Sequence, residues 1–118
     1  MPTFVISTNL PKDKIPADFL KVAADTLAKT LGKPLSYIVV QVIPDQMISW
    51  GGGSDPCAIA SVMSIGQLGV QENKKHSAVL FQLVEKYLGI AGDRMYISFV
   101  DVDKSNVGYV GKTFHDIL

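Results

Sequence analysis

The stretch LGKPLSYIVVQVI, residues 31–43, decides the fold because it joins a helix end to a strand within a few residues. Its counterpart LGIAGDRMYISFV, residues 88–100, begins 57 residues further along the chain, at residue 88 instead of 31. Each stretch places a glycine where a left-handed cap closes a helix and then runs into β-branched and aromatic residues. This recurrence predicts two copies of one β-α-β unit.

Two amphipathic helices precede these stretches. The first is expected to begin at Pro16, with Asp18 near its positive end, and to close at Gly32. The second is expected over residues 74–88, closing at Gly89. Each carries an apolar stripe at helical spacing, formed by Leu20, Ala23, Ala24, Leu27, Ala28 and Leu31 in the first and by Leu80, Leu83, Val84, Tyr87 and Leu88 in the second.

Strands are predicted over residues 3–8, 37–43, 58–68 and 95–102, with a short additional strand at 47–50 and a loop at 69–73. The run at 37–43 is too continuously apolar for a surface strand, so we expect both of its faces to be covered. A right-handed β-α-β unit places its two strands parallel with the helix on one face. The predicted fold is therefore α/β (α+β), with residues 1–118 forming one domain.

In this fold two β-α-β repeats make a four-stranded mixed sheet with two helices on one face. The opposite face, lined with Ile, Val, Met and Phe, is then bare. Exposed apolar surface costs about 25 cal/mol per Å², so we expect oligomerisation through this face. The tail at residues 105–118 is expected to add an edge strand to a neighbouring chain.

Composition excludes several classes of function. Eleven Lys and Arg balance eleven Asp and Glu, so the chain lacks the basic surface that nucleic-acid binding requires. Gln41, Gln67 and Lys86 break the longest apolar runs, so no membrane insertion is expected. No signal peptide is recognisable, which predicts a cytosolic protein that uses another route if it acts outside the cell. Cys57, the single cysteine, fits a reducing compartment.

The usual cofactor and metal motifs are absent. His76 and His115 lie far apart with no other ligand at zinc spacing, so both are predicted to be surface histidines and no metal is expected. Cys57 has no partner for a CxxC pair and is expected to be a packed or partly exposed thiol. No phosphate-binding loop, calcium loop or GxSxG elbow survives inspection, so no cofactor is predicted.

Pro2 and Lys33 each have an ordinary structural interpretation. Proline cannot donate to a sheet ladder, so Pro2 is typical of the first residue of an edge strand. A lysine such as Lys33 is favoured at the negative end of a helix dipole. Taken alone, neither residue points to chemistry.

Taken together, nine short segments resemble the macrophage migration inhibitory factor and D-dopachrome tautomerase family, in order and from end to end. They are MPTF, TNLP, LGKPLSYI, PDQ, GGSDPCA, SIG, DRMYISF, NVGY and TF. The resemblance implies a homotrimer, present in the cytoplasm and secreted without a signal peptide. It also implies a keto-enol tautomerase of phenylpyruvate-like and dopachrome-like substrates, small aromatic keto or enol acids, that acts as a pro-inflammatory cytokine as well.

The resemblance assigns the catalytic base to Pro2. Removal of Met1 before a small residue would leave Pro2 with a free secondary amine. An α-amino group titrates at about 7.7 to 8.0, so a base for neutral pH needs a lowered pKa. A neighbouring Lys33 ammonium and an apolar pocket that includes Ile65 would both lower the pKa of the amine.

The remaining site residues follow from the same resemblance. Lys33 and Ile65 are expected to bind substrate, with Lys33 pairing with its carboxylate. Tyr96 and Ser98, two apart on one strand, would reach the pocket of the neighbouring subunit. Ser98 replaces a family asparagine, which predicts a shifted substrate preference. Tyr37 and Val107 are expected to line the pocket, and Tyr109 stands where many relatives carry tryptophan.

Other positions bear on competing activities. Ala60 replaces the second cysteine of a redox pair and Val22 replaces an acidic residue proposed for a nuclease role, so neither activity is expected. Lys12 and Asp45 retain the charges linked to cell-surface receptor binding, although lysine lacks the bidentate geometry of arginine. Two alternatives stay open: a cytokine with a vestigial pocket, and a trimeric structural domain without turnover.

Overall fold

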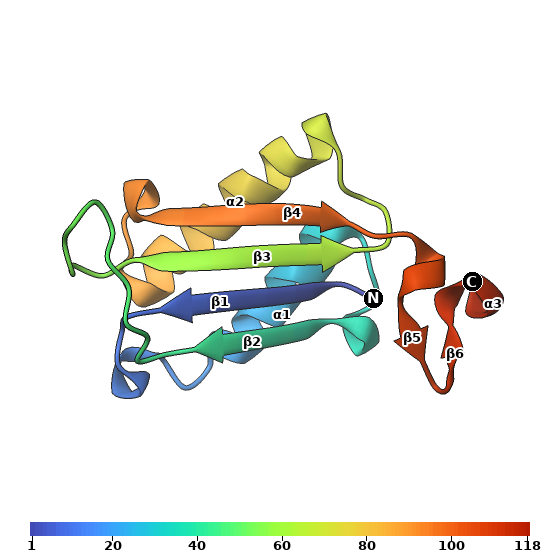
Figure 1. The fold of residues 1–118 in the computed structure, drawn as a ribbon, viewed down its shortest axis with the longest axis horizontal. Coiled ribbons are helices and arrows are strands. Elements are labelled where there is room, and N and C mark those ends of the chain that lie inside the picture. The colour runs from blue at the N-terminus through green and yellow to red at the C-terminus, as the bar shows by residue number, and fades with distance from the viewer.

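A four-stranded sheet lies at the centre of the computed structural model, which describes residues 1–118. Both long helices cover the same face of this sheet, and the other face carries no element of the chain (Figure 1). The strand order is β2-β1-β3-β4. The elements of this layer are β1 (Thr3–Thr8), α1 (Phe19–Leu31), β2 (Val39–Ile43), β3 (Ala58–Ser64), α2 (Val70–Leu88) and β4 (Met95–Asp101).

The strand pairing confirms the predicted repeat. β1 pairs with β2 in parallel, as β3 does with β4, while β1 and β3 are antiparallel at the centre. Each parallel pair encloses one helix in the chain order. The sheet is therefore mixed, with two β-α-β units joined edge to edge.

The core lies between the sheet and the two helices. β1 alternates buried and half-buried residues, and Phe4 and Ile6 point toward the helices with no exposed surface. Leu27 of α1 and Leu80 of α2 complete the layer from the other side and are also fully buried. One sheet face and two helical stripes thus build a single core, as the apolar patterns predict.

Both helices end where the glycines predict. Gly32 and Gly89 adopt the left-handed conformation, and each donates its N–H back into the last helical turn. The predicted starts are less accurate. α1 begins at Phe19, after a turn in which the Pro16 carbonyl accepts from the Phe19 N–H.

The predicted loop at 69–73 is wrong, since most of it forms the first turn of α2. The Asn73 side-chain oxygen accepts a hydrogen bond from the Gly69 N–H at 3.3 Å, and the Asn73 N–H donates to the Gly69 carbonyl at 2.8 Å. These local bonds allow a polar segment without an apolar stripe to start a helix.

Two strand predictions are corrected. β3 stops at Ser64 instead of residue 68, because Gly66 and Gln67 both adopt positive φ angles that leave the sheet. Residues 47–50 form no strand. Only an isolated bridge between Trp50 and Gly53 occurs there, and the Met47 side chain is fully exposed.

The prediction that both faces of residues 37–43 are covered is wrong for the single chain. β2 is an edge strand, and Val39 on its outer face is 55% exposed. Tyr37 belongs to a 3-10 turn (Leu35–Tyr37) ahead of the strand. The continuous apolar run therefore reflects a face that this chain by itself leaves open.

The C-terminal tail projects beyond the end of the sheet (Figure 1). Its strands β5 (Gly108–Tyr109) and β6 (Lys112–Thr113) pair with each other, and a short helix α3 (Phe114–Ile117) follows. Further 3-10 turns occupy Lys12–Lys14, Gly92–Arg94 and Lys104–Asn106. Pairing of the tail with a neighbouring chain stays a prediction.

Three side chains singled out in the sequence are placed as follows. His115 is exposed, as predicted, whereas His76 is only 3% exposed, so the prediction of a surface histidine is wrong there. Its two ring nitrogens both have hydrogen-bond partners, which allows a polar ring to be buried. Cys57 is a fully buried free thiol. None of the helices has the length and apolarity that crossing a membrane requires.

Candidate functional site

The N-terminus lies at the end of the sheet, next to the C-terminal hairpin (Figure 1). Pro2 is buried, and its carbonyl accepts a hydrogen bond from the Val39 N–H at 3.1 Å. In the antiparallel register Thr3 lies opposite Met63, so Pro2 falls next to Ser64, one residue beyond that pair. The first residues of the chain are therefore fixed between β2 and β3.

Lys33 and Ile65 meet at this end of the sheet. The Lys33 ammonium donates to the Ile65 carbonyl oxygen at 3.0 Å. Lys33 is directed there by the left-handed Gly32 that ends α1. An ammonium has three N–H donors, so after this bond two remain for an anionic ligand. Thirty-two residues of sequence separate the two groups, and packing of the repeats brings them together.

The electrostatics of the N-terminal amine match a base. The pKa of this amine is lowered below its ordinary value. Desolvation by burial is the larger cause, and the positive charge of Lys33 is the smaller. In this structure the amine belongs to Met1, and it stands in for the Pro2 nitrogen, one residue further in. Pro2 is itself buried, and we expect the same two causes to act on an amine at that position.

An aromatic cluster borders the same end of the sheet. The Tyr109 and Phe114 rings stack at 5.4 Å, and the Tyr37 ring packs edge-on against Tyr109 at 5.9 Å. Val107 is attached to the cluster, because its carbonyl accepts from the Phe114 N–H at 3.0 Å. Tyr37 stands two residues before Val39, the partner of the Pro2 carbonyl. Tyr37 and Val107 thus belong to one cluster, which Tyr37 joins to the start of the strand that binds Pro2.

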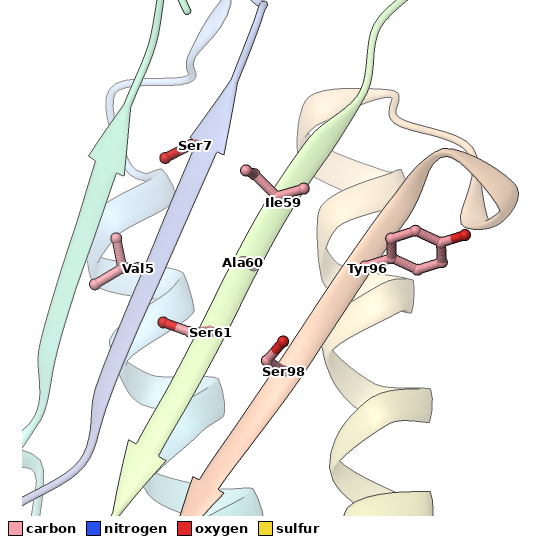
Figure 2. Close-up of a pocket in the computed structure, with 7 residues that line it drawn as sticks. All are labelled: Val5, Ser7, Ile59, Ala60, Ser61, Tyr96 and Ser98. Carbon is pink, nitrogen blue, oxygen red and sulfur yellow. The ribbon is translucent and has the colours of Figure 1, made fainter. Parts of the chain in front are cut away.

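Tyr96 and Ser98 lie elsewhere in the single chain. Figure 2 shows both side chains on the bare face of the sheet, with those of Val5, Ser7, Ile59 and Ser61 and the stretch of β3 at Ala60, whose own side chain belongs to the core. Together these residues line a shallow groove of about 450 Å³. Tyr96 pairs with Ile59, five residues from Ser64 along β3, which is about 16 Å at the rise of a strand. One chain therefore does not bring Tyr96 and Ser98 to Pro2.

The bare face is apolar at its edge. Tyr96 is 70% exposed and Ile59 is 52% exposed. The Trp50 ring lies 4.6 Å from the Tyr96 ring and supports it from the loop that precedes β3. Tyr96 is thus held in an outward position, as a side chain that contacts another molecule would be.

Reasoning from sequence missed three residues near the site. Phe114 is the buried centre of the aromatic cluster, and the TF segment was its only signal. The Ser64 hydroxyl is buried beside Pro2 without a hydrogen-bond partner, and no sequence pattern marks it. His76 binds the backbone of Gln67, two residues after Ile65. These three roles depend on contacts between distant segments.

Lys12 and Asp45 lie on adjoining exposed loops. The Asp45 N–H donates to the Leu10 carbonyl at 2.8 Å, which joins the two loops side by side. Asp45 has a positive φ of 60°, which turns the chain there. A groove of about 400 Å³ next to them is lined by Lys12, Ile15, Pro16, Ala17, Leu20, Val42 and Pro44. No group of three or more His, Cys, Asp or Glu side chains is placed to hold a metal ion.

Fold and site together define an α+β protein of two β-α-β repeats with a candidate site at its N-terminal amine. The family model described as "Macrophage migration inhibitory factor (MIF)" matches residues 1–115. The chain is 43% identical to macrophage migration inhibitory factor of Rattus norvegicus over 114 residues, 97% of this chain and 99% of the relative. It is 46% identical to the homolog of Trichuris trichiura, covering 97% and 100%.

Solved structures agree with these relatives. The macrophage migration inhibitory factor of Trichinella spiralis superimposes with a TM-score of 0.94 at 39% identity, covering 95% of this chain and 99% of that one. The homologue of Prochlorococcus marinus gives a TM-score of 0.88 at 30% identity, covering 95% and 98%. The chain belongs to the macrophage migration inhibitory factor family. Membership supports, in general terms, a protein of the cytokine and tautomerase type.

Proposed function

We propose that this protein is a keto-enol tautomerase of phenylpyruvate-like and dopachrome-like substrates, with the Pro2 amine as general base once Met1 is removed. One observation carries the proposal: the N-terminal amine is partly desolvated beside the Lys33 ammonium, and its pKa is lowered. A neutral amine can accept a proton, and a base is most effective when its pKa lies near the working pH.

The proton transfer balances without a cofactor. The neutral Pro2 amine removes a proton from the carbon next to the substrate carbonyl. The electron pair of that C–H bond forms a carbon–carbon double bond, and the carbonyl oxygen takes up a proton from water to give the enol. The Pro2 ammonium then returns its proton to the hydroxide that is left, which restores the neutral amine. The reverse sequence converts enol to keto, with the Pro2 ammonium returning its proton to carbon. A positioned base typically contributes about 10² to 10⁴ in rate.

Substrate binding uses the groups around the amine. The Lys33 ammonium, which keeps donors beyond its bond to the Ile65 carbonyl, pairs with the substrate carboxylate. The Ile65 side chain and the aromatic cluster of Tyr37, Tyr109 and Phe114 provide apolar walls for an aromatic ring. Such a pocket selects a flat acid with a carboxylate at one end.

A homotrimer completes the pocket in this proposal. Tyr96 and Ser98 pair with Ile59 and Ser61, about 16 Å and about 10 Å along the sheet from the position of Pro2, so they serve the site of a neighbouring copy. Its support is the outward position of Tyr96 on an apolar face that the chain leaves open. Ser98 offers one hydroxyl where an asparagine would offer an amide, so we expect weaker binding of substrates that need the second donor.

The decisive experiment moves the amine without touching the core. An alanine inserted between Met1 and Pro2 removes the free prolyl nitrogen, and an alanine added after Leu118 is the matched control. We expect the first variant to lose at least about 10² of the rate with hydroxyphenylpyruvate, and the control to keep it. Equal activity in wild type and the N-terminal insertion variant would sink the assignment of Pro2.

A cytokine role is the second candidate function, with action both in the cytoplasm and outside the cell after secretion without a signal peptide. The observation that favours it is the hydrogen-bonded pairing of the exposed loops that carry Lys12 and Asp45. Binding of labelled protein to macrophage-lineage cells tests it, with a double variant Lys12→Ala and Asp45→Ala as comparison. No binding at micromolar concentration would count against this role, whereas binding without turnover would favour a vestigial pocket.

A further inference from the structure

The His76 ring is a buried connector between two helices and the loop after β3. Thr30 Oγ1 lies 2.7 Å from His76 Nδ1, and His76 Nε2 lies 2.8 Å from the Gln67 carbonyl oxygen. A carbonyl only accepts, so Nε2 carries the proton. Nδ1 of a neutral ring then accepts from the Thr30 hydroxyl. Both ring nitrogens are satisfied in a side chain that is 3% exposed.

The loop that His76 binds is held at four successive residues. The Ser64 carbonyl accepts from the Val102 N–H, and the Ile65 carbonyl accepts from Lys33, each at 3.0 Å. The Gly66 N–H then donates to the Asp101 carboxylate at 3.0 Å, and the Gln67 carbonyl accepts from His76. Of these contacts, that of His76 comes from the most buried side chain.

Gln67 needs an external constraint. Its φ is +62°, in the left-handed region that residues with a Cβ rarely adopt, and Gly66 before it is also left-handed at +76°. A residue in such a conformation persists where surrounding contacts determine it. The bond from His76 Nε2 fixes the Gln67 carbonyl and so fixes the turn at residues 65–67, which begins at Ile65.

The Ile65 carbonyl in turn sets the direction of Lys33. The single hydrogen bond of the Lys33 side chain goes to this oxygen. If the turn at 65–67 relaxes, the carbonyl moves and the ammonium loses its fixed orientation. Thr30, the other partner of His76, lies on α1 two residues before the capping Gly32. The ring therefore links the loop to the same helix end that presents Lys33.

We propose that His76 is a positioning residue for substrate binding: it holds the turn at residues 65–67 and thereby the orientation of Lys33 and Ile65. This inference rests on the proposed function for its kinetic consequence, since Lys33 is the group that pairs with substrate. His76 itself touches neither the substrate nor the reacting atoms. Its effect falls on binding more than on proton transfer, because Pro2 is held separately, through the bond from the Val39 N–H to its carbonyl.

Three variants separate the two ends of the connector. His76→Leu removes both hydrogen bonds. His76→Gln keeps an N–H at about the reach of Nε2 and so keeps the bond to Gln67. Thr30→Val removes only the hydrogen bond between the Thr30 hydroxyl and His76 Nδ1. Val84→Ala is the matched control, because Val84 is a fully buried core residue two turns further along the same face of α2.

Steady-state kinetics with hydroxyphenylpyruvate gives the first readout. We expect His76→Leu to raise KM about tenfold, the loss of roughly one hydrogen bond, with kcat within about threefold of wild type. His76→Gln should restore KM to within about threefold of the wild-type value. The KM of Thr30→Val should lie between those of His76→Leu and His76→Gln. Val84→Ala should lower the melting temperature and leave KM unchanged. An equal rise of KM in His76→Leu and Val84→Ala would overturn the proposal.

A second readout does not depend on turnover. Backbone ¹⁵N order parameters of Gly66 and Gln67 should fall in His76→Leu and stay high in His76→Gln and Val84→Ala. The dissociation constant of an unreactive aryl carboxylate, 4-hydroxyphenylacetate, should rise in parallel with KM. A wild type without turnover would defeat the proposed function alone, because the order parameters and this affinity would still decide the role of His76. Unchanged order parameters of Gly66 and Gln67 in His76→Leu would overturn the positioning role of His76.

Discussion

Burial and a neighbouring cation act together on one amine. Desolvation first, and the Lys33 charge second, lower the pKa of the N-terminal amine. An unperturbed α-amino group would be largely protonated at neutral pH, since its pKa is about 7.7 to 8.0. At the residue scale, the proposed chemistry therefore depends on where the first nitrogen of the chain lies and less on which residue carries it.

The pH dependence of turnover tests this view. We expect kcat/KM to rise with pH through the lowered pKa of the amine and to level off before about 8, the ordinary value. Lys33→Gln should move the midpoint upward only in part, because desolvation is the larger cause, and should also raise KM about tenfold through the lost carboxylate pairing. An unchanged midpoint in the variant would contradict the contribution of Lys33.

The same lowered pKa predicts a change of stability. The unfolded chain binds more protons at this amine than the native chain between the lowered pKa and about 8, so the free energy of unfolding rises with pH in that window. Denaturant titrations at several pH values measure this slope. Acetylation of the amine should remove it, and a slope that survives acetylation would belong to another group.

Ser64 offers a test of buried polarity. Its hydroxyl is fully buried and has no hydrogen-bond partner in the chain, which is unfavourable. We expect Ser64→Ala to leave the free energy of unfolding unchanged or to raise it by about 1 kcal/mol. Thr8→Val is the contrasting variant, because the Thr8 hydroxyl donates to the Cys57 carbonyl at 2.7 Å. It should be destabilising by about 1 kcal/mol, and a larger loss in Ser64→Ala would contradict the prediction.

At the scale of elements, the two glycine caps form a natural pair. Gly32 and Gly89 both close helices at φ of +63° and +68°, and a Cβ at either position would meet no atom within 4 Å. Alanine at each site should therefore lower the stability by about 1 kcal/mol, which is the cost of holding a residue with a Cβ in the left-handed conformation. Only Gly32→Ala should also raise KM, because Lys33 follows it. Equal KM values in the two variants would show that the cap does not direct Lys33.

The elements also show where prediction from sequence stops. The caps and the repeat were readable because left-handed glycines and helical stripes are local features. The end of β3 was not, because Gln67 adopts a positive φ held by the distant His76. The start of α2 was missed as well, since Asn73 caps it from within a polar segment.

At the scale of the whole molecule, we expect assembly through the open sheet face. Ile59 is half exposed on this face, so a charge there should be tolerated by the single chain and rejected by a trimer interface. We expect Ile59→Glu to remain folded, to be monomeric by light scattering, and to lose most of its turnover because Tyr96 no longer reaches a neighbouring site. Val70→Glu, at an exposed helix start, is the control that should stay trimeric. A wild type that scatters as a stable monomer would refute the shared pocket.

The sequence by itself determined the order of the elements, the glycine ends of both helices and the pattern of two β-α-β units, because periodicity and backbone conformation are local properties. Through its resemblance to a family it also pointed to Pro2, Lys33, Ile65, Tyr37 and Val107. Only the tertiary structure decided that Lys33 binds the Ile65 carbonyl, that the ring of His76 on α2 is buried against Thr30 of α1, and that Tyr96 and Ser98 lie on the open sheet face at a distance from Pro2. These depend on strand order and on contacts between segments far apart in the chain, which packing of the whole core sets.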